Sequence, residues 1–379
     1  MSIEQLNLAR ARVYSFLLPS LTDLSKELNN NLISEIRNDR SPNVSALARS
    51  SLRLTEEMAP EINKIIELVC QRIQIPRSLV DVYVFPGADL NGFCYIHELP
   101  ITVGISSSIV NSLAGDELAF VLGHEIGHAL FKETANFAAN EDCLEDQIFS
   151  RAIEISVDRV GLLAANNCDA AFRAILKTLS GLNDDTLRYD FSYFMSEARD
   201  ALGSDVTEQQ LYSSHPPLAQ RFKALVSFSS SDVYLSRINA DTKGGMPIEQ
   251  VNKVITAGLT NAVDAKAYKI INKALTDLTL WIACLLIISE TKISLGELQR
   301  VCGIEICKVD IEKAVSFVSG YSNKEKAVVL NEKIQSHFVN ASKLAPRATI
   351  KLIDNIEIVF PNLKFAKIED VAHLIKMPV

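Results

Sequence analysis

The pattern of hydrophobic and polar positions predicts a helical opening, a short region of strands and a long helical remainder. Residues 80–85, VDVYVF, alternate and are rich in β-branched and aromatic side chains, which predicts a strand. Residues 93–106, FCYIHELPITVGIS, predict two further short strands that meet near residues 98–100. The first 75 residues are expected to be helical because their apolar side chains recur at helical spacing, most clearly through Met58, Ile62, Ile65, Ile66, Val69 and Ile73.

Helical periodicity returns at Asp116 and continues to about Phe228. Residues 229–247 contain serines, a Gly-Gly pair and a proline with little periodicity, which is typical of a linker, and we place that linker at residues 229–246. Beyond them the pattern is helical again, with capping-box spacing at Ser294–Glu297 and Ser322–Glu325. We therefore expect a predominantly helical α+β protein: residues 1–228 form a first domain with a small antiparallel sheet, and residues 247–379 form an all-α domain.

Composition and charge narrow the class of protein. The chain has 379 residues, of which 48% are hydrophobic and 22% charged, as in a soluble globular protein. It has no basic stripe that would neutralise phosphates, so nucleic acid is not expected as a partner. The seven cysteines contain no CxxC pair and are expected to be reduced thiols, which favours a cytoplasmic protein. The longest apolar run, residues 278–288, covers about 16 Å as a helix, so no membrane span is expected.

Candidate chemistry begins at residues 121–133, VLGHEIGHALFKE. His124 and His128 are four residues apart, so on a helix their imidazoles share one face and can converge on one ion. Glu125 lies beside the first imidazole, where its carboxylate can act as general base toward a water activated by zinc. The alternative is a helix whose histidines are ordinary core or surface residues, because the HExxH pattern also occurs by chance.

Two features near this motif favour the zinc interpretation. Gly123 and Gly127 are poor helix formers, and their presence indicates that another element approaches this helix closely. A second strong helical pattern at residues 149–165 carries Glu154 and Asp158 on one face, so Glu154 is the candidate third ligand. Asp158 would then hold the outer N–H of a ligand histidine. Alternatively, Arg151 and Arg159 neutralise the two carboxylates on a solvated surface.

Three motifs in order carry a resemblance to a known family: HEIGH, then Glu154-x-x-x-Asp158-Arg, then SSHPPLAQRFKAL at residues 213–225. Over residues 55–225 the chain resembles the zinc metallopeptidases of the HtpX and CAAX-prenyl-endopeptidase (Ste-like) type. The resemblance implies a gluzincin-like fold, with one zinc on His124, His128 and Glu154. It departs from the family pattern at Gly92 and Val157, where alanine is usual.

The resemblance and the residues together predict a metalloendopeptidase with Glu125 as general base. A peptide or protein substrate would lie along the edge strand that contains Gly92, Phe93 and Cys94. His215 precedes two prolines that hold the chain extended, and Arg221 follows one turn into the next helix. We expect His215 to donate to the oxyanion and Arg221 to order the site or the substrate, although a helix cap and a surface arginine would give the same pattern.

Two residues near the strands and one helical segment have interpretations that do not involve the zinc site. Cys94 and His97 lie near the expected strands, but zinc needs no further protein ligand, so both are expected to be structural. Residues 278–301 resemble a tellurite-resistance TerB-like helical domain, and a generic helical bundle fits the pattern equally well. The alternative function is a zinc-stabilised scaffold without catalysis, whose C-terminal helical domain binds a protein partner.

Overall fold

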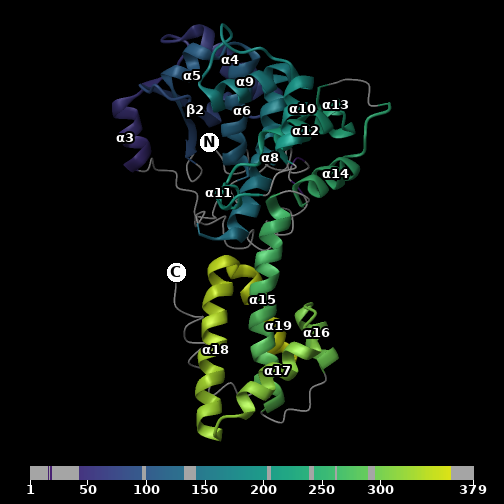
Figure 1. Cartoon of the computed structure of the whole chain (residues 1–379). Coiled ribbons are helices and arrows are strands. Elements are labelled where there is room, and N and C mark those ends of the chain that lie inside the picture. Colours follow the sequence, from purple (N-terminus) through teal and green to yellow (C-terminus); the bar gives the residue numbers. More distant parts are fainter. Residues whose placement is uncertain are drawn as a thin grey trace. The chain divides into compact units, whose positions relative to one another are not determined.

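The structure is a computed structural model, and it describes residues 16, 18, 42–95, 100–131, 142–202, 206–238, 243–260, 263–288 and 295–359. The chain forms two compact units. Unit 1 comprises residues 1–138, 149–205 and 213–262, and unit 2 comprises residues 139–148, 206–212 and 263–379. Figure 1 shows the helices and strands of each unit.

Unit 1 combines a small sheet with several helices. Its strands are β1 (Leu52–Arg53), β2 (Val80–Phe85), β3 (Gly92–Tyr95) and β4 (Ile101–Ser106). Its described helices are α3 (Pro42–Ser50), α4 (Pro60–Arg72), the 3-10 helix η3 (Arg77–Leu79), α5 (Ser107–Ser112), α6 (Asp116–Leu130), most of α8 (Leu144–Ala165), α9 (Cys168–Ser180), α10 (Phe191–Leu202), α12 (Leu218–Ser229), α13 (Asp232–Arg237) and α14 (Ile248–Thr260).

The sheet has the strand order β1-β2-β4-β3, so β3 is an edge strand among the described residues. β3 pairs antiparallel with β4, whereas β2 and β4 run parallel in the register Val80↔Ile101 to Phe85↔Ser106. The three expected strands are confirmed, but the sheet is mixed rather than antiparallel. The chain reverses direction between β2 and β3 and again between β3 and β4. After these two reversals β4 runs in the same direction as β2, so the two strands pair in parallel.

Helix α6 lies in the core of unit 1 beside α4 and α9 (Figure 1). It begins at Asp116, as expected, after Gly115 with a φ of 54°, and its acidic first turn complements the helix dipole. Twelve of its fifteen residues are buried, including the neighbours of both histidines. The helix is therefore held rigidly by packing on most of its circumference.

Two expectations for the first 75 residues need correction. Leu52 and Arg53 form strand β1, and the helical stripe begins only with α4 at Pro60. Met58 precedes that helix and is 61% exposed, so it is not part of the buried stripe. Most of the first 41 residues lie outside the described part of the chain, and so do His97 and the turn at 290–293.

Unit 2 is helical throughout its described residues. It contains α11 (Glu208–Leu211), α15 (Val263–Ile288), α16 (Leu295–Cys302), α17 (Lys308–Ser319), α18 (Asn323–Leu344) and α19 (Pro346–Val359). Helices α15 and α18 lie side by side (Figure 1), and the capping box of Ser322 and Glu325 starts α18 as expected. Leu144, Ile148 and Leu211 belong to the same core as α15. Unit 2 is thus built from three separate stretches of the sequence.

The boundary between the units differs from the expected linker at residues 229–246. That stretch contains α13, and Ser231 forms a β-bridge with Met246. Val251, Ile255 and Leu259 of α14 pack into the core of unit 1, which moves the division to residues 262 and 263.

Helix α15 is longer than the apolar run at residues 278–288 suggested. Among the described helices it alone is long and apolar enough to cross a membrane, and half of its most apolar stretch is buried within the protein. Residues such as Leu278, Ile282 and Leu286 are in the core of unit 2, as expected for the central helix of a bundle. The absence of a membrane span stays a prediction.

Candidate metal centre and active site

Helix α6 presents His124 and His128 on one face, as the four-residue spacing predicts. The centroids of the two rings are 4.9 Å apart, and their Nε2 atoms are 3.3 Å apart. This distance fits a hydrogen bond between the rings if one Nε2 carries a proton, and it equally fits a cation shared by two lone pairs.

Helix α8 approaches α6 so closely that glycines are needed at the contact. A Cβ atom on Gly123 would lie 2.3 Å from the Cβ of Ala164, and a Cβ on Gly161 would lie 2.9 Å from the carbonyl oxygen of Phe120. A Cβ on Gly127 would meet Val157 at 3.1 Å. Ordinary carbon–carbon contacts are about 3.5–4.0 Å. The close approach that Gly123 and Gly127 predicted is therefore confirmed. It places the face of α8 that bears Glu154 and Asp158 next to the histidines.

Glu154 of α8 completes a cluster of three donor groups with His124 and His128. Its Oε2 is 3.6 Å from His124 Nε2, and its Oε1 is 3.5 Å from His128 Nε2. Glu154 Oε2 is buried and has no hydrogen-bond partner, which is costly for a carboxylate oxygen unless a cation lies beside it.

The donor atoms of this cluster fit zinc. Zinc takes nitrogen and oxygen ligands at about 2.0–2.1 Å in tetrahedral geometry, and the edges of such a tetrahedron are about 3.3–3.4 Å long. The distances of 3.3, 3.5 and 3.6 Å between the donor atoms are close to these edges. Among the described residues, these three side chains are the group whose donors all lie within 4.8 Å of one another.

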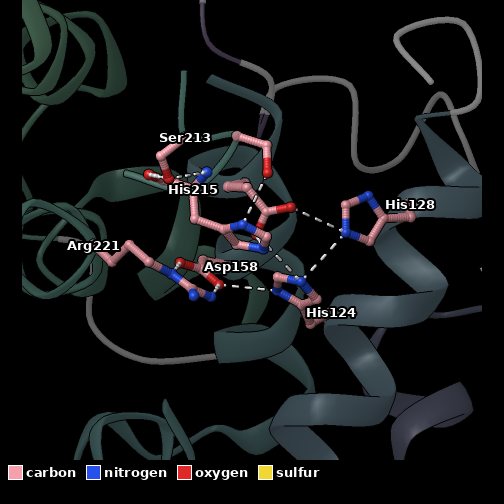
Figure 2. Close-up of polar contacts among 8 residues, drawn as sticks. His124, His128, Asp158, Ser213, His215 and Arg221 are labelled. Carbon is pink, nitrogen blue, oxygen red and sulfur yellow. Dashed lines mark hydrogen bonds and ion pairs between the residues drawn. The ribbon is translucent and has the colours of Figure 1, made fainter. Parts of the chain in front are cut away.

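Asp158 lies behind His124 and is held by Arg221 of α12. Its Oδ1 accepts a hydrogen bond from His124 Nδ1 at 2.9 Å, and Arg221 donates to both carboxylate oxygens at 2.6 and 2.8 Å (Figure 2). A proton on Nδ1 leaves the lone pair of Nε2 directed at the cluster, as metal binding requires. Asp158 thus lies behind a ligand histidine, where the sequence predicted it. Of the two roles expected for Arg221, its contact with Asp158 supports ordering of the site.

The alternative explanation for Glu154 and Asp158, a solvated surface neutralised by neighbouring arginines, is wrong. Both carboxylates are buried, and so are Arg151 and Arg159. Arg159 donates to Phe16 O and Asn252 Oδ1, and Arg151 donates to Ser213 O. The charges on this helix face therefore belong to the interior of unit 1.

The charges of the cluster shift the pKa values of its members. Burial opposes ionisation of Glu154, but His124, His128 and Arg221 outweigh it and lower the pKa of Glu154. In the same way Arg221 overcomes burial at Asp158 and lowers its pKa to about 2. Burial lowers the pKa of His128 to about 4. Burial opposes a charge on His124 as well, but its acidic neighbours Asp158 and Glu154 outweigh burial and raise its pKa. At neutral pH the cluster therefore offers ionised carboxylates and, at His128, a neutral imidazole, which are forms that bind a metal.

Glu125 lies between the histidines and strand β3. It is 9% exposed, and burial raises its pKa to about 7, with His124 opposing the shift. A Cβ atom on Gly92 would lie 3.0 Å from Glu125 Oε1, so the backbone of β3 passes directly beside this carboxylate. An alanine at position 92 would therefore require a small shift of the Glu125 carboxylate.

Strand β3 carries the three residues predicted to receive a substrate, and it is the edge strand next to Glu125. The ring of Phe93 packs against Gly104 of β4, in the space that a Cβ on Gly104 would occupy. Cys94 is partly buried, and burial with the charge of Glu125 raises the pKa of its thiol. All seven cysteines are free thiols, as expected, and Cys94 has no place in the donor cluster.

His215 reaches the cluster from the segment before α12. Its Nε2 is 3.6 Å from Glu154 Oε2, while 59% of its side chain is exposed. Ser214 Oγ is 3.0 Å from His215 Nδ1, and the Ser213 hydroxyl bonds both the backbone N–H and the carbonyl of His215. Sequence reasoning identified His215 and Arg221 but gave no role to the two serines, although their position directly before the histidine was a usable signal.

Comparison with known proteins agrees with the geometry. Residues 56–144 match the sequence model of Peptidase family M48. The chain is also 28% identical over 105 residues to proteins named "Protease HtpX homolog" from Trichormus variabilis and from Nostoc sp.. Each match covers 27% of this chain and 35% of the relative, so the chain spans about a third of the length of these relatives. No solved structure matches. The resemblance to HtpX-type zinc metallopeptidases is confirmed for the segment that carries α6.

Proposed function

We propose that this chain is a zinc-dependent metalloendopeptidase. The observation that carries the proposal is the cluster of His124, His128 and Glu154, in which three donor atoms face one point and one buried oxygen has no hydrogen-bond partner. Zinc, when bound there, supplies a Lewis acid that polarises a carbonyl and lowers the pKa of water.

Glu125 is the general base of the proposed reaction. Its carboxylate lies one residue from a metal ligand but outside the donor cluster, so it is available to take a proton from the attacking water. Its burial excludes solvent, and a pKa near neutrality suits both acceptance of that proton and its later delivery to the leaving amine. A site that served only to stabilise the fold would have no use for this carboxylate, which argues against the scaffold alternative.

The substrate is a peptide segment in an extended conformation. Strand β3 offers the unpaired backbone groups of a sheet edge, and a segment that pairs with it is brought beside Glu125. His215 Nε2 lies 3.6 Å from Glu154 Oε2, so it is close enough to the cluster to donate to the oxyanion that develops on the scissile carbonyl. Asp158 and Arg221 hold His124 in the required tautomer and do not touch the substrate.

The free cysteines and the buried residues of α15 support a soluble, cytoplasmic enzyme as part of the proposal. Unit 2 is proposed to bind a protein partner. Its resemblance to TerB-like domains stays a prediction.

The test uses the full chain, loaded with one equivalent of zinc, and a mixed peptide library analysed by mass spectrometry. We expect internal cleavage by the wild type and a loss of at least about 10²-fold in Glu125→Gln, with zinc content unchanged. Glu249→Gln, at an exposed glutamate of α14, is the matched control and should cleave at the wild-type rate. Zinc binding without cleavage of any peptide would favour the scaffold, and equal rates in Glu125→Gln would exclude Glu125 as the base.

A further inference from the structure

One face of α8 carries Arg151, Glu154 and Asp158 at positions i, i+3 and i+7, which align along a helix. The segment from Ser213 to Arg221 follows this face in the same order. Arg151 donates to Ser213 O at 2.6 Å, and His215 Nε2 lies 3.6 Å from Glu154 Oε2. Arg221 binds Asp158 (Figure 2). The segment around His215 is therefore attached to α8 on both sides of the histidine.

The attachment before the histidine depends on Arg151. Its side chain is 1% exposed, so its position is fixed by packing. Ser213 links Arg151 to the backbone of His215. Its hydroxyl accepts a hydrogen bond from His215 N at 3.3 Å and donates to His215 O at 3.1 Å. The backbone of His215 is thus tied to the helix that supplies Glu154.

The ring of His215 is more exposed than the rest of the site, and it needs its own orienting contact. Ser214 Oγ lies 3.0 Å from Nδ1. If the hydroxyl donates to Nδ1, the imidazole proton resides on Nε2, the atom that faces Glu154. Only this tautomer of a neutral imidazole can donate to an oxyanion beside the cluster. If Nδ1 donates instead, Nε2 has no proton to give.

We propose that Arg151 and Ser214 are positioning residues for His215. Ser214 donates to Nδ1 and keeps the proton on Nε2, while Arg151 sets the distance of the ring from Glu154 through the Ser213 carbonyl. The proposal rests on the proposed role of His215 in catalysis. It assigns functions to two residues that lie outside the donor cluster.

The tautomer can be observed without activity. Metal-free protein labelled with ¹⁵N-histidine has six histidines, and His215→Ala identifies the signals of His215. In the neutral imidazole we expect Nδ1 of His215 to be unprotonated and Nε2 to carry the proton. In Ser214→Ala the ring should gain mobility. A protonated Nδ1 in the wild type, or an unchanged ring in Ser214→Ala, overturns the role of Ser214.

Kinetics of the zinc-loaded chain test both residues. Ser214→Ala should lower kcat by about 10-fold, the value of one modest hydrogen bond, with KM and zinc content unchanged. Arg151→Lys should lower kcat by about 10²-fold, because a displacement near 1 Å has such an effect. In the His215→Ala background neither change should lower kcat further, since both act through that ring.

Two matched controls separate positioning from folding. Ser236→Ala removes an exposed serine whose hydroxyl bonds only a backbone carbonyl of its own helix, and it should leave kcat unchanged. Arg159→Lys alters another buried arginine of α8 and should lower stability without the same loss in kcat. Equal losses in Arg151→Lys and Arg159→Lys, or additive losses with His215→Ala, overturn the proposal. If His215→Ala itself keeps its kcat, the proposed role of His215 in catalysis fails, whereas the tautomer measurement still decides the role of Ser214.

Discussion

Replacing Gly123 with alanine tests whether the close contact of α6 and α8 assembles the metal site. The added Cβ would lie 2.3 Å from the Cβ of Ala164 and 3.1 Å from the Cα of Gly161. Carbon atoms pack at about 3.5–4.0 Å, so the helices must separate locally by about 1.2 Å or more. Neither contact can be relieved by rotating a flexible side chain, because all the atoms involved are Cα or Cβ atoms.

The expected effect is larger on metal binding than on folding. Overpacking of this kind typically costs about 1–3 kcal/mol. The ligands come from both helices, and a metal site tolerates deviations of only about 0.2 Å. A separation near 1 Å should therefore weaken zinc binding by at least about 10²-fold, which removes about 2.7 kcal/mol of the stability that zinc confers at a fixed concentration.

Zinc affinity would be measured by competition with a chromophoric chelator, and thermal unfolding would be followed with and without zinc. Gly258→Ala is the matched control, because Gly258 also lies in a helix of unit 1 but has no atom within 4 Å of its Cβ position. That change should leave zinc affinity unaltered and stabilise α14 by up to about 1 kcal/mol. Wild-type zinc affinity in Gly123→Ala would refute the conclusion that this contact sets the geometry of the ligands.

Three further predictions concern the other parts of the structure. Arg221→Met should leave Asp158 buried without its cation, lower the free energy of unfolding by about 3–5 kcal/mol and weaken zinc binding; a stability within 1 kcal/mol of wild type in denaturant titrations would contradict this. In metal-free protein the raised pKa of Glu125, about 7 against a usual value of 4.5, means that the folded state binds the proton more tightly, so stability falls as the pH rises between these values. Glu125→Gln should therefore unfold like the wild type at pH 4 but be more stable by up to about 3 kcal/mol at pH 8, and parallel pH profiles would contradict this. Residues 247–379 expressed alone should unfold at lower temperature than unit 2 in the full chain, because they lack Leu144, Ile148 and Leu211 of its core, and an equal Tm would show that these residues contribute little.

Local periodicity and spacing predicted much of the fold and the centre of the site. The alternation of residues 80–85 was enough to identify β2, and the four-residue spacing of the histidines was enough to place them together. Glu154 and Asp158 became candidates because two carboxylates four residues apart on a helix repel each other unless a cation or a donor lies between them. The spacing within each helix or strand depends on the geometry of that element alone, whereas the link between the two helices came from the resemblance to a known family.

Contacts between elements far apart in the sequence could not be predicted in the same way. The parallel pairing of β2 with β4 depends on the path of the chain between them, and no residue in either strand specifies it. A surface position for Arg151 and Arg159 stayed an open alternative, because helical spacing does not show what a neighbouring segment presents to them. The assignment of Leu144 and Leu211 to unit 2 also needed the tertiary structure, since each lies in a short stretch that residues of unit 1 flank on both sides.

The edge strand β3 has a consequence for which proteins the proposed enzyme can attack. Recognition through main-chain N–H and C=O groups depends on the conformation of the substrate more than on its sequence. A segment already paired within its own sheet or helix has no such groups to offer, so natively folded proteins would be protected, and unfolded stretches or loops as long as the four residues of β3 would be vulnerable. The site would then select its targets by their state of folding, and a protein would become a substrate when it lost its structure and cease to be one when it regained it.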